Sequence, residues 1–293
     1  MKKWINAFRL RTLPLAFSCI IVGCGLAFAD GCFNLSMAVM LLTTTLFLQV
    51  LSNLANDYGD FVKGTDNEGR VGPKRALQSG DISKPQMIKA IWIASFLCAI
   101  SGSILIYWGT KGLNIYILIL FALLGLLSIG AAIKYSVGKN AYGYAAMGDV
   151  AVFIFFGLVG VLGAYYLQSH CLRWMLLLPA TSIGLLSVAV LNINNMRDHL
   201  EDAKSGKNTL VTIFGIKFAK LYHLLLNICA IMAMVLYDST FNIMLFAGIL
   251  LFIAPAIKIA CSDNHEEFDP FLKIQALGTF VYSLVFAVCL SWR

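Results

Sequence analysis

Two polar stretches of the sequence, residues 53–66 and 194–207, carry carboxylates and carboxamides at regular spacing. On a helix, side chains four residues apart lie on one face, so each stretch would point several oxygen atoms at one place. Such hard oxygen ligands suit Mg²⁺, which takes one or two carboxylates and shares the oxygens of a bound phosphate. The candidate metal ligands are Asn56, Asp57, Asp60, Asp66, Asn194, Asp198 and Asp202.

Basic side chains accompany both acidic stretches. Arginine offers a planar fork and lysine a compact charge, and both bind phosphate oxygens. We therefore expect the two stretches to form halves of one site for metal ions and a diphosphate. A single aspartate at a helix end can also be a cap or be simply solvated, an alternative that two matched clusters weaken. The candidate diphosphate ligands are Lys63, Arg70, Arg75, Lys134, Arg197 and Lys207.

The composition places these polar stretches in a membrane protein. The 293 residues are 59% hydrophobic and 13% charged, with a mean hydropathy of +0.80. A bilayer core of about 30 Å needs roughly 20 apolar residues per helical span, and only helices satisfy the backbone over such runs. The predicted fold class is all-α: a polytopic membrane bundle of about nine helices around a central cavity open to the cytoplasmic side.

The apolar runs also predict topology. The nine expected spans are residues 12–29, 36–55, 88–108, 113–134, 146–167, 172–195, 217–236, 241–260 and 270–291. With this alternation all Lys and Arg residues except Lys111, Arg173 and Arg293 fall on one side, which the positive-inside rule assigns to the cytoplasm. We expect a multi-pass protein of the cell inner membrane with a cytoplasmic N-terminus and a C-terminus on the opposite side.

The acidic stretches resemble an internal repeat, because each keeps an Asn and an Asp four residues later. An even number of spans separates the two copies, so both open to the same side of the membrane. We interpret the chain as one domain, 1–293, made of two pseudo-repeats at roughly 1–135 and 140–293. Sites at the interface of internal repeats are common in membrane proteins.

The motifs are similar to those of the 1,4-dihydroxy-2-naphthoate polyprenyltransferases of menaquinone biosynthesis, a group of intramembrane aromatic prenyltransferases. The resemblance covers about residues 6–292. One departure concerns Asp66, which follows Asp60 by six residues where the superfamily's generic motif has four, as is typical of the dihydroxynaphthoate group. The matching positions are 11–16, 56–60, 63–64, 66, 70, 72–73, 75, 78–80, 142–144, 148–149, 156–157, 194–198 and 206–207.

The resemblance implies Mg²⁺-dependent transfer of an all-trans polyprenyl group from its diphosphate to the ring of 1,4-dihydroxy-2-naphthoate, with loss of CO₂, giving demethylmenaquinone. Asp60 and Asp198 would hold the catalytic metal. Arg11 is the candidate for the acceptor carboxylate, and Tyr135 and Tyr144 stand at the expected mouth of the cavity. Asp149 could deprotonate a ring hydroxyl, or it could cap a helix.

The expected partners are polyprenyl diphosphate, 1,4-dihydroxy-2-naphthoate and the lipid bilayer, with neither nucleic acid nor an obligate protein partner. Three other functions compete. A prenyltransferase for another aromatic acceptor such as 4-hydroxybenzoate is disfavoured by the interval from Asp60 to Asp66 and by the Gly72–Pro73 pair. A cation-coupled transporter would place its ions near the bilayer midplane. A CDP-alcohol phosphotransferase would need a different pattern of aspartates.

Overall fold

The computed structural model of the protein describes residues 2–66, 72–237, 241–262 and 264–291. Across these ranges the regular structure is helical, and an isolated backbone bridge joins Ala145 and Asn208. Nine helices in the described ranges are long and apolar enough to cross a membrane. The predicted all-α membrane bundle is confirmed.

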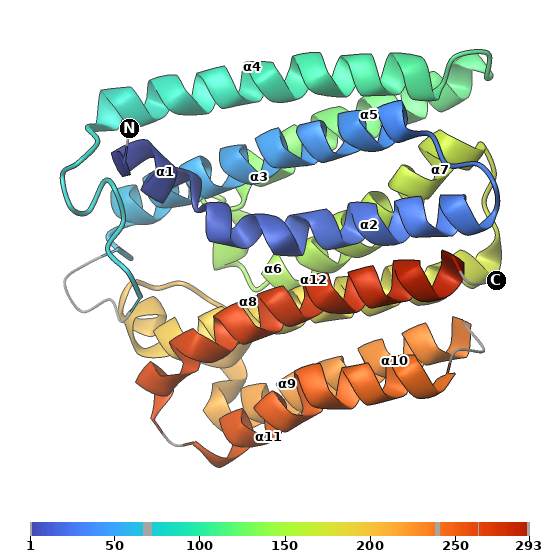
Figure 1. Ribbon diagram of the computed structural model, residues 1–293. Coiled ribbons are helices and arrows are strands. Elements are labelled where there is room, and N and C mark those ends of the chain that lie inside the picture. The colour runs from blue at the N-terminus through green and yellow to red at the C-terminus, as the bar shows by residue number, and fades with distance from the viewer. Residues whose placement is uncertain (1, 67–71, 238–240, 263, 292–293) are drawn as a thin grey trace.

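The helices follow one another through short connections (Figure 1). In chain order they are α1 (Lys2–Phe8), η1 (Leu10–Thr12), α2 (Leu13–Ala29), α3 (Leu35–Lys63), α4 (Lys84–Gly109), α5 (Ile115–Lys134), η2 (Tyr142–Tyr144), α6 (Gly148–Val152), η3 (Phe153–Leu162), α7 (Gly163–Ser169), η4 (Trp174–Leu176), α8 (Leu177–Lys204), α9 (Leu210–Tyr237), α10 (Phe241–Gly248), η5 (Ile249–Ile253), α11 (Ala254–Cys261), η6 (His265–Phe268) and α12 (Asp269–Ser291).

Two helices are longer than the apolar pattern indicated. The expected ends near residues 55 and 195 are passed by α3, which ends at Lys63, and by α8, which ends at Lys204. A helix needs apolar residues only within the hydrocarbon core, so both continue through their polar stretches. Gly64 ends α3 with a φ of 75°, a left-handed conformation that glycine adopts without steric cost.

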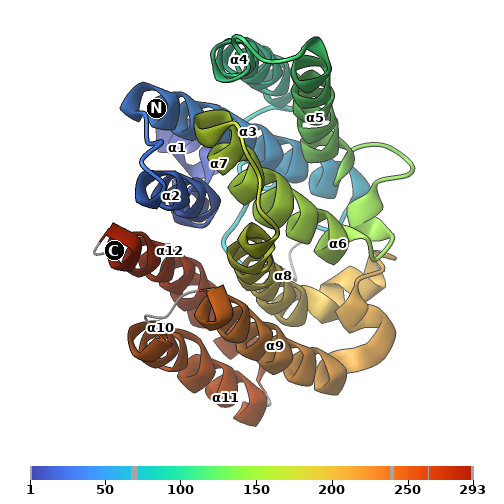
Figure 2. The ribbon, with the colours of Figure 1, turned by 90° about the vertical axis from the view of Figure 1, so that its right-hand side faces the viewer.

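The bundle is organised around α8, which packs against α9, η3 and α12. Viewed end-on, α4 and α5 form one edge and α10 and α11 form the opposite edge (Figure 2). The main hydrophobic core fills the space between α2, α8, α9 and α12 with side chains such as Leu26, Ile183, Met234 and Phe286. The proposed division into two pseudo-repeats stays a prediction.

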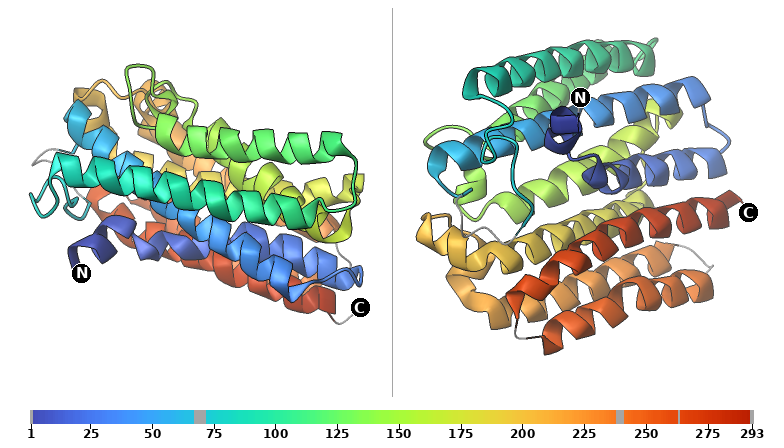
Figure 3. Two further views of the ribbon diagram at one scale, coloured as in Figure 1. Left: turned by 90° about the horizontal axis from the view of Figure 1, so that it is seen from above. Right: turned by 60° about the vertical axis from the view of Figure 1, so that its left-hand side comes forward.

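The two ends of the bundle differ in character. We call the end that carries Asp60 and Asp198 the acidic end, and the other the far end. The chain starts at the acidic end, and α12 finishes at the far end (Figure 3). At the far end, hydrogen bonds tie the connecting loops together: the Tyr165 hydroxyl donates to Asp30 at 2.6 Å, and the Asn34 N–H donates to Gln168 at 2.7 Å.

Candidate active site

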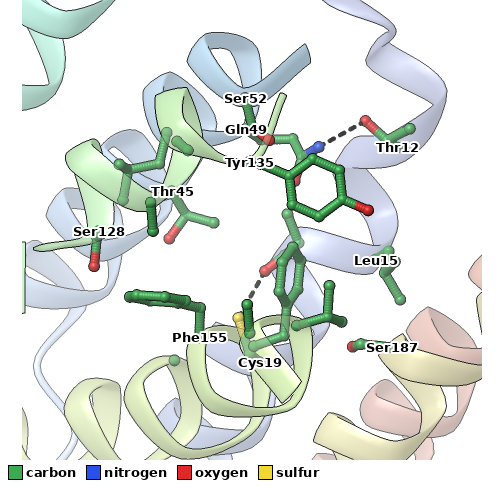
Figure 4. A pocket seen from close by; sticks show the side chains of 18 of the residues that line it. Thr12, Leu15, Cys19, Thr45, Gln49, Ser52, Ser128, Tyr135, Phe155 and Ser187 are labelled. Atoms are coloured by element: carbon green, nitrogen blue, oxygen red, sulfur yellow. Dashed lines mark hydrogen bonds between the residues drawn. The ribbon is translucent and has the colours of Figure 1, made fainter. Parts of the chain in front are cut away.

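A cavity of about 420 Å³ extends from the acidic end between α2, α3, α5, η3 and α8. Its polar wall at the acidic end gives way to an apolar wall that reaches Leu41 and Leu167. Figure 4 shows Tyr135, Gln49 and Thr12 on one side of this cavity and Phe155 and Cys19 on another. The charged and amide side chains that line the polar wall are Arg9, Asn56, Asp60, Arg75, Asn194, Asp198, Glu201, Asp202 and Lys207.

On α3, Asn56 and Asp60 lie one turn apart and face the cavity. Asp60 Oδ1 accepts a hydrogen bond from the Tyr144 hydroxyl at 2.8 Å. The Asn56 carboxamide donates to Asp60 Oδ2 at 2.8 Å and contacts Ser136 Oγ at 2.7 Å. Both donors to Asp60 are neutral, and the Tyr144 hydroxyl is also 2.7 Å from Thr65 Oγ1. The carboxylate of Asp60 is therefore held by neutral hydrogen-bond donors.

On α8, the guanidinium of Arg197 engages the matching pair of residues. Its Nε donates to Asp198 Oδ1 at 2.8 Å and its Nη2 donates to Asp198 Oδ2 at 2.7 Å. Nη2 also donates to Asn194 Oδ1 at 2.9 Å, and Nη1 donates to Asp269 at the start of α12. We call Asn56 and Asp60 the α3 ladder, and Asn194, Asp198 and Asp202 the α8 ladder. Arg197, which the sequence suggested for the diphosphate, is thus bound to the α8 ladder and to Asp269.

Lys207 provides the second cation of the α8 ladder. Its ammonium lies 3.3 Å from Asp202, and the residue is 7% exposed. Burial lowers the pKa of Lys207, but the carboxylates of Asp202 and Asp60 raise it by more, so the pKa lies above its ordinary value. The ring of Tyr144 is 5.6 Å from this ammonium and 3.6 Å from that of Lys63. The polar wall thus holds a fixed positive charge at neutral pH.

The donor set of the two ladders fits Mg²⁺. Carboxylate and amide oxygens from Asn56, Asp60, Asn194, Asp198 and Asp202 line the same cavity. In the described ranges, no three Asp, Glu, His or Cys side chains converge closely enough to hold a metal by themselves. Mg²⁺ commonly completes a shell of one or two carboxylates with water and substrate phosphates. Asp202 Oδ2 is a buried oxygen that accepts no hydrogen bond from the described residues, so it is available to a metal. The two ladders therefore fit a metal that is bound jointly with a phosphorylated ligand.

Two predicted site residues, Asp57 and Arg11, face a second cavity. This cavity of about 380 Å³ lies between α1, α3 and residues 73–76. Asp57 is 1% exposed, and its Oδ2 accepts a hydrogen bond from the Ala76 N–H at 3.2 Å. One residue turns a helix by about 100°, so Asp57 points away from Asn56. Arg11 lines this second cavity and not the main one.

The remaining charged candidates divide into those near the charged end of the main cavity and those away from it. Asp66 is buried beside Arg75, with 3.9 Å between Oδ2 and Nε, and Arg75 lines both cavities. Lys134 is exposed at the end of α5 and does not line the main cavity. Arg70 lies outside the described residues. The structure thus brings Arg75 and Lys207 together at the polar wall and leaves Lys134 apart from them.

Of the candidates for the aromatic acceptor and its deprotonation, Tyr135 lines the main cavity and Asp149 does not. Tyr135 lines the cavity and packs edge-on against Tyr142, with ring centres 5.4 Å apart. Burial raises the pKa of Tyr142 to about 12 and raises the pKa values of Tyr135 and Tyr144 above their ordinary range, so all three hydroxyls stay protonated at neutral pH. Asp149 is buried at the start of α6 and hydrogen-bonds to Tyr222 of α9 instead of lining the cavity.

Arg9 is a site residue that the sequence did not reveal. It lines both cavities, and its Nη1 donates to the Asn56 side chain at 3.3 Å. Its backbone is left-handed with a φ of 48°, and its carbonyl accepts a hydrogen bond from Thr12 Oγ1 at 2.9 Å. Arg9 and Arg11 belong to one basic group in the sequence, and only this turn decides which of them reaches the main cavity.

Ser136 is a second residue that sequence reasoning missed. It reaches Asn56 because α3 and the residues after α5 approach closely at Gly59, where an added Cβ would lie 2.5 Å from Ser136 Cβ. The glycine between Asn56 and Asp60 could have indicated a close approach, although its partner could not be known. Gly59 therefore lets the loop after α5 hold the α3 ladder in place.

The cavity in this membrane bundle is polar at one end and apolar along its length. Such an arrangement suits a membrane-embedded enzyme whose substrates are lipid-like with a charged head. The chain belongs to the UbiA prenyltransferase family, which it matches over residues 16–289. The predicted family resemblance is confirmed.

Named relatives match over nearly the whole chain. The sequence is 43% identical over 267 residues to 1,4-dihydroxy-2-naphthoate octaprenyltransferase of Escherichia coli (strain K12), covering 91% of this chain and 86% of that protein. It is 31% identical to the Mycobacterium tuberculosis protein of the same name, covering 99% and 97% of the two chains.

Solved structures share the fold at low sequence identity. A UbiA homologue from Archaeoglobus fulgidus bound to GPP and Mg²⁺ aligns with a TM-score of 0.63 at 15% identity, covering 98% of this chain and 99% of that one. A UbiA homologue from Aeropyrum pernix K1 aligns with the same TM-score, 0.63, at 16% identity, covering 92% of this chain and 98% of that one.

Proposed function

We propose that this chain transfers an all-trans polyprenyl group from polyprenyl diphosphate to 1,4-dihydroxy-2-naphthoate, releasing diphosphate and CO₂ and giving demethylmenaquinone. The named relatives are 1,4-dihydroxy-2-naphthoate octaprenyltransferases, which supports this acceptor and a polyprenyl donor. The observation that carries the proposal is one cavity whose charged end continues directly into an apolar wall. A polyprenyl diphosphate has the same division between a charged head and an apolar tail.

The apolar part of the cavity suits the polyprenyl tail. Leu41 and Asn56 both line the cavity, and at 1.5 Å per residue they are about 22 Å apart along α3. Side chains such as Phe121, Phe155 and Leu105 line this length. Several isoprene units fit beside α3, and the apolar wall keeps water away from an allylic cation formed at the charged end.

The charged end suits the diphosphate. Arg9, Arg75 and Lys207 line it and offer N–H donors whose charge stabilises a developing diphosphate anion. Mg²⁺, when bound, would add positive charge that weakens the bond to the leaving group. We assign the binding of Mg²⁺ to the oxygens of Asn56, Asp60, Asn194, Asp198 and Asp202, and we leave Asp57 and Asp66 out of this set because neither lines the cavity.

The acceptor would bind where the two cavities meet. Arg9 lines both of them, and Arg11 and Lys74 line the second, so a carboxylate entering from that side meets basic side chains. The ring would then lie near Tyr135 and Tyr142, which line the main cavity close to its charged end. Arg9 and Arg11 together replace Arg11 alone as the proposed carboxylate ligands.

We also propose that the acidic end faces the cytoplasm in the cell inner membrane, which places the N-terminus inside and the C-terminus outside. A test is Ala203→Cys, at an exposed position near the end of α8, in a variant whose native cysteines are replaced by serine. An impermeant maleimide should label it in inverted vesicles and not in intact spheroplasts. Labelling in intact spheroplasts would contradict the orientation.

The function itself is tested by competition between acceptors. Membranes carrying the protein should receive octaprenyl diphosphate and Mg²⁺ with equimolar 1,4-dihydroxy-2-naphthoate, 4-hydroxybenzoate and homogentisate, and the prenylated products should be identified by mass spectrometry. We expect a decarboxylated prenyl naphthoquinol as the main product. A prenylated 4-hydroxybenzoate as the main product would reassign the acceptor while keeping the reaction class.

A further inference from the structure

The guanidinium of Arg197 occupies the oxygen atoms through which α8 would bind a metal. It donates to both carboxylate oxygens of Asp198, at 2.8 and 2.7 Å, and to Asn194 Oδ1 at 2.9 Å. A guanidinium held bidentately by a carboxylate takes one lone pair of each oxygen and offsets the negative charge that would attract a metal. Arg197 therefore competes with a metal for these oxygens, and metal binding at Asp198 favours its withdrawal.

A withdrawn Arg197 needs another anionic partner. Its side chain is 2% exposed, so it cannot turn into water while α8 stays in place. A buried charge that loses its partner is strongly destabilising. Asp269, the first residue of α12, already accepts a hydrogen bond from Arg197 Nη1, and its own side chain is 41% exposed. Asp269 is therefore an anion within reach that does not face the metal-binding oxygens.

We propose that Asp269 is a positioning residue that keeps Arg197 neutralised when Asp198 and Asn194 release it to bind the metal. This inference rests on the metal role assigned to α8 under the proposed function. The α3 ladder needs no such device, because Asp60 is held by the neutral donors Tyr144 and Asn56. Both donors to the α3 carboxylate are thus neutral, whereas the α8 carboxylate becomes more available to a cation as Arg197 shifts toward Asp269 on α12.

Mn²⁺ binding tests this transfer without relying on turnover. The purified protein in detergent, carrying Asp60→Asn to remove the α3 carboxylate, is titrated with Mn²⁺ alone while the free ion is followed by electron paramagnetic resonance. Asp269→Asn should weaken binding about tenfold, the scale of one charged hydrogen bond. Arg197→Gln should tighten it. Asp269→Asn added to Arg197→Gln should change nothing further, because Asp269 acts through Arg197.

Two controls separate this role from a structural one. Glu267→Gln removes the same charge two residues earlier, from an exposed side chain that bonds Ser262, and should leave Mn²⁺ affinity unchanged. Asp269→Glu should restore most of the affinity lost in Asp269→Asn. Equal weakening by Asp269→Asn with and without Arg197 would overturn the transfer role. The titrations are repeated with inorganic diphosphate, because the site is expected to share its metal with a phosphate. Absence of Mn²⁺ binding in both the wild-type protein and the Asp60→Asn parent, with and without diphosphate, would instead overturn the metal role itself.

Discussion

The acidic ends of α3 and α8 carry the same pattern, an Asn followed four residues later by an Asp, in different electrostatic surroundings. On α3, Asp60 is satisfied by a hydroxyl and an amide. On α8, Asp198 is held by the Arg197 guanidinium and Asp202 lies against the Lys207 ammonium. A neutral donor leaves the charge of a carboxylate available to an incoming cation, whereas a fixed cation cancels it.

One sequence pattern therefore serves two physical roles. On the α3 ladder, neutral donors orient the Asp60 carboxylate, and the Arg9 guanidinium contacts only the Asn56 side chain. The α8 ladder is folded as a set of ion pairs with Arg197 and Lys207. Mutations that are equivalent in sequence should for this reason have unequal effects on stability, even where their effects on the reaction are alike.

The largest expected effects come from Asp60→Ala and Asp198→Ala. Each should reduce prenyl transfer in membranes by roughly 100- to 1000-fold or more, because charge stabilisation at the leaving group is lost. Only Asp198→Ala should also lower the melting temperature clearly, since it removes one partner of a buried ion pair, a change that costs about 3 kcal/mol or more. Equal melting temperatures for the two variants would break the contrast between the ladders.

Lys207→Ala should be next in size. The specificity constant for polyprenyl diphosphate should fall roughly tenfold to a hundredfold, as expected for a charged hydrogen bond of about 1.5–3 kcal/mol. The matched control is Lys204→Ala, which removes the same charge from a surface pair with Glu201 and should change the constant less than about twofold. A similar loss in both variants would indicate a general charge effect.

Arg9→Ala and Arg11→Ala should separate the acceptor from the diphosphate. Arg9 contacts the α3 ladder and lines both cavities, so its loss should raise the Michaelis constant for the naphthoate about tenfold. Arg11→Ala should raise it only a few-fold. Arg9→Lys should recover part of the loss, because an ammonium cannot form a planar two-point contact. A larger effect from Arg11→Ala would return the main role to Arg11.

Tyr144→Phe should have a smaller effect that concerns α3 alone. It removes one hydrogen bond to Asp60, a net contribution of about 0.5–1.5 kcal/mol, and the catalytic efficiency should fall roughly three- to tenfold. Tyr107→Phe is the control, because Tyr107 is exposed on α4 and does not line the main cavity. Initial rates at saturating Mg²⁺ would show whether the loss persists when the metal site is filled.

The smallest expected effect is that of pH on the contribution of Lys207 to stability, which should not change near neutral pH. Because the pKa of Lys207 is raised in the folded protein, its ammonium contributes in full below the unfolded pKa of about 10.4 and is lost only as pH rises through the folded value. The difference in melting temperature between wild type and Lys207→Gln should be the same at pH 7 and pH 9. A difference that shrinks over this interval would mean that the lysine titrates early.

Composition and spacing were enough to predict the nine spans and the facing of Asn56 and Asp60 along one helix. Helix geometry alone turns Asp57 about 100° away from Asn56, but the sequence could not show that the Ala76 N–H meets it on the other side of α3. The choice between Arg9 and Arg11 depends on one left-handed residue. Asp269 lies more than seventy positions from Arg197 in the sequence, and no local pattern signals such a pairing.

The far end of the bundle has a consequence for the membrane itself. The cavity is polar at one end and extends along most of α3, yet its lining stops at Leu41 and Leu167. Both side chains belong to the main core, and beyond them Asp30 is held by Tyr165 and Arg173. A water-filled path of similar length, open at both ends, would conduct protons and dissipate the transmembrane gradient. The apolar core and the tied loops at the far end therefore close the path that a proton would need through the bundle.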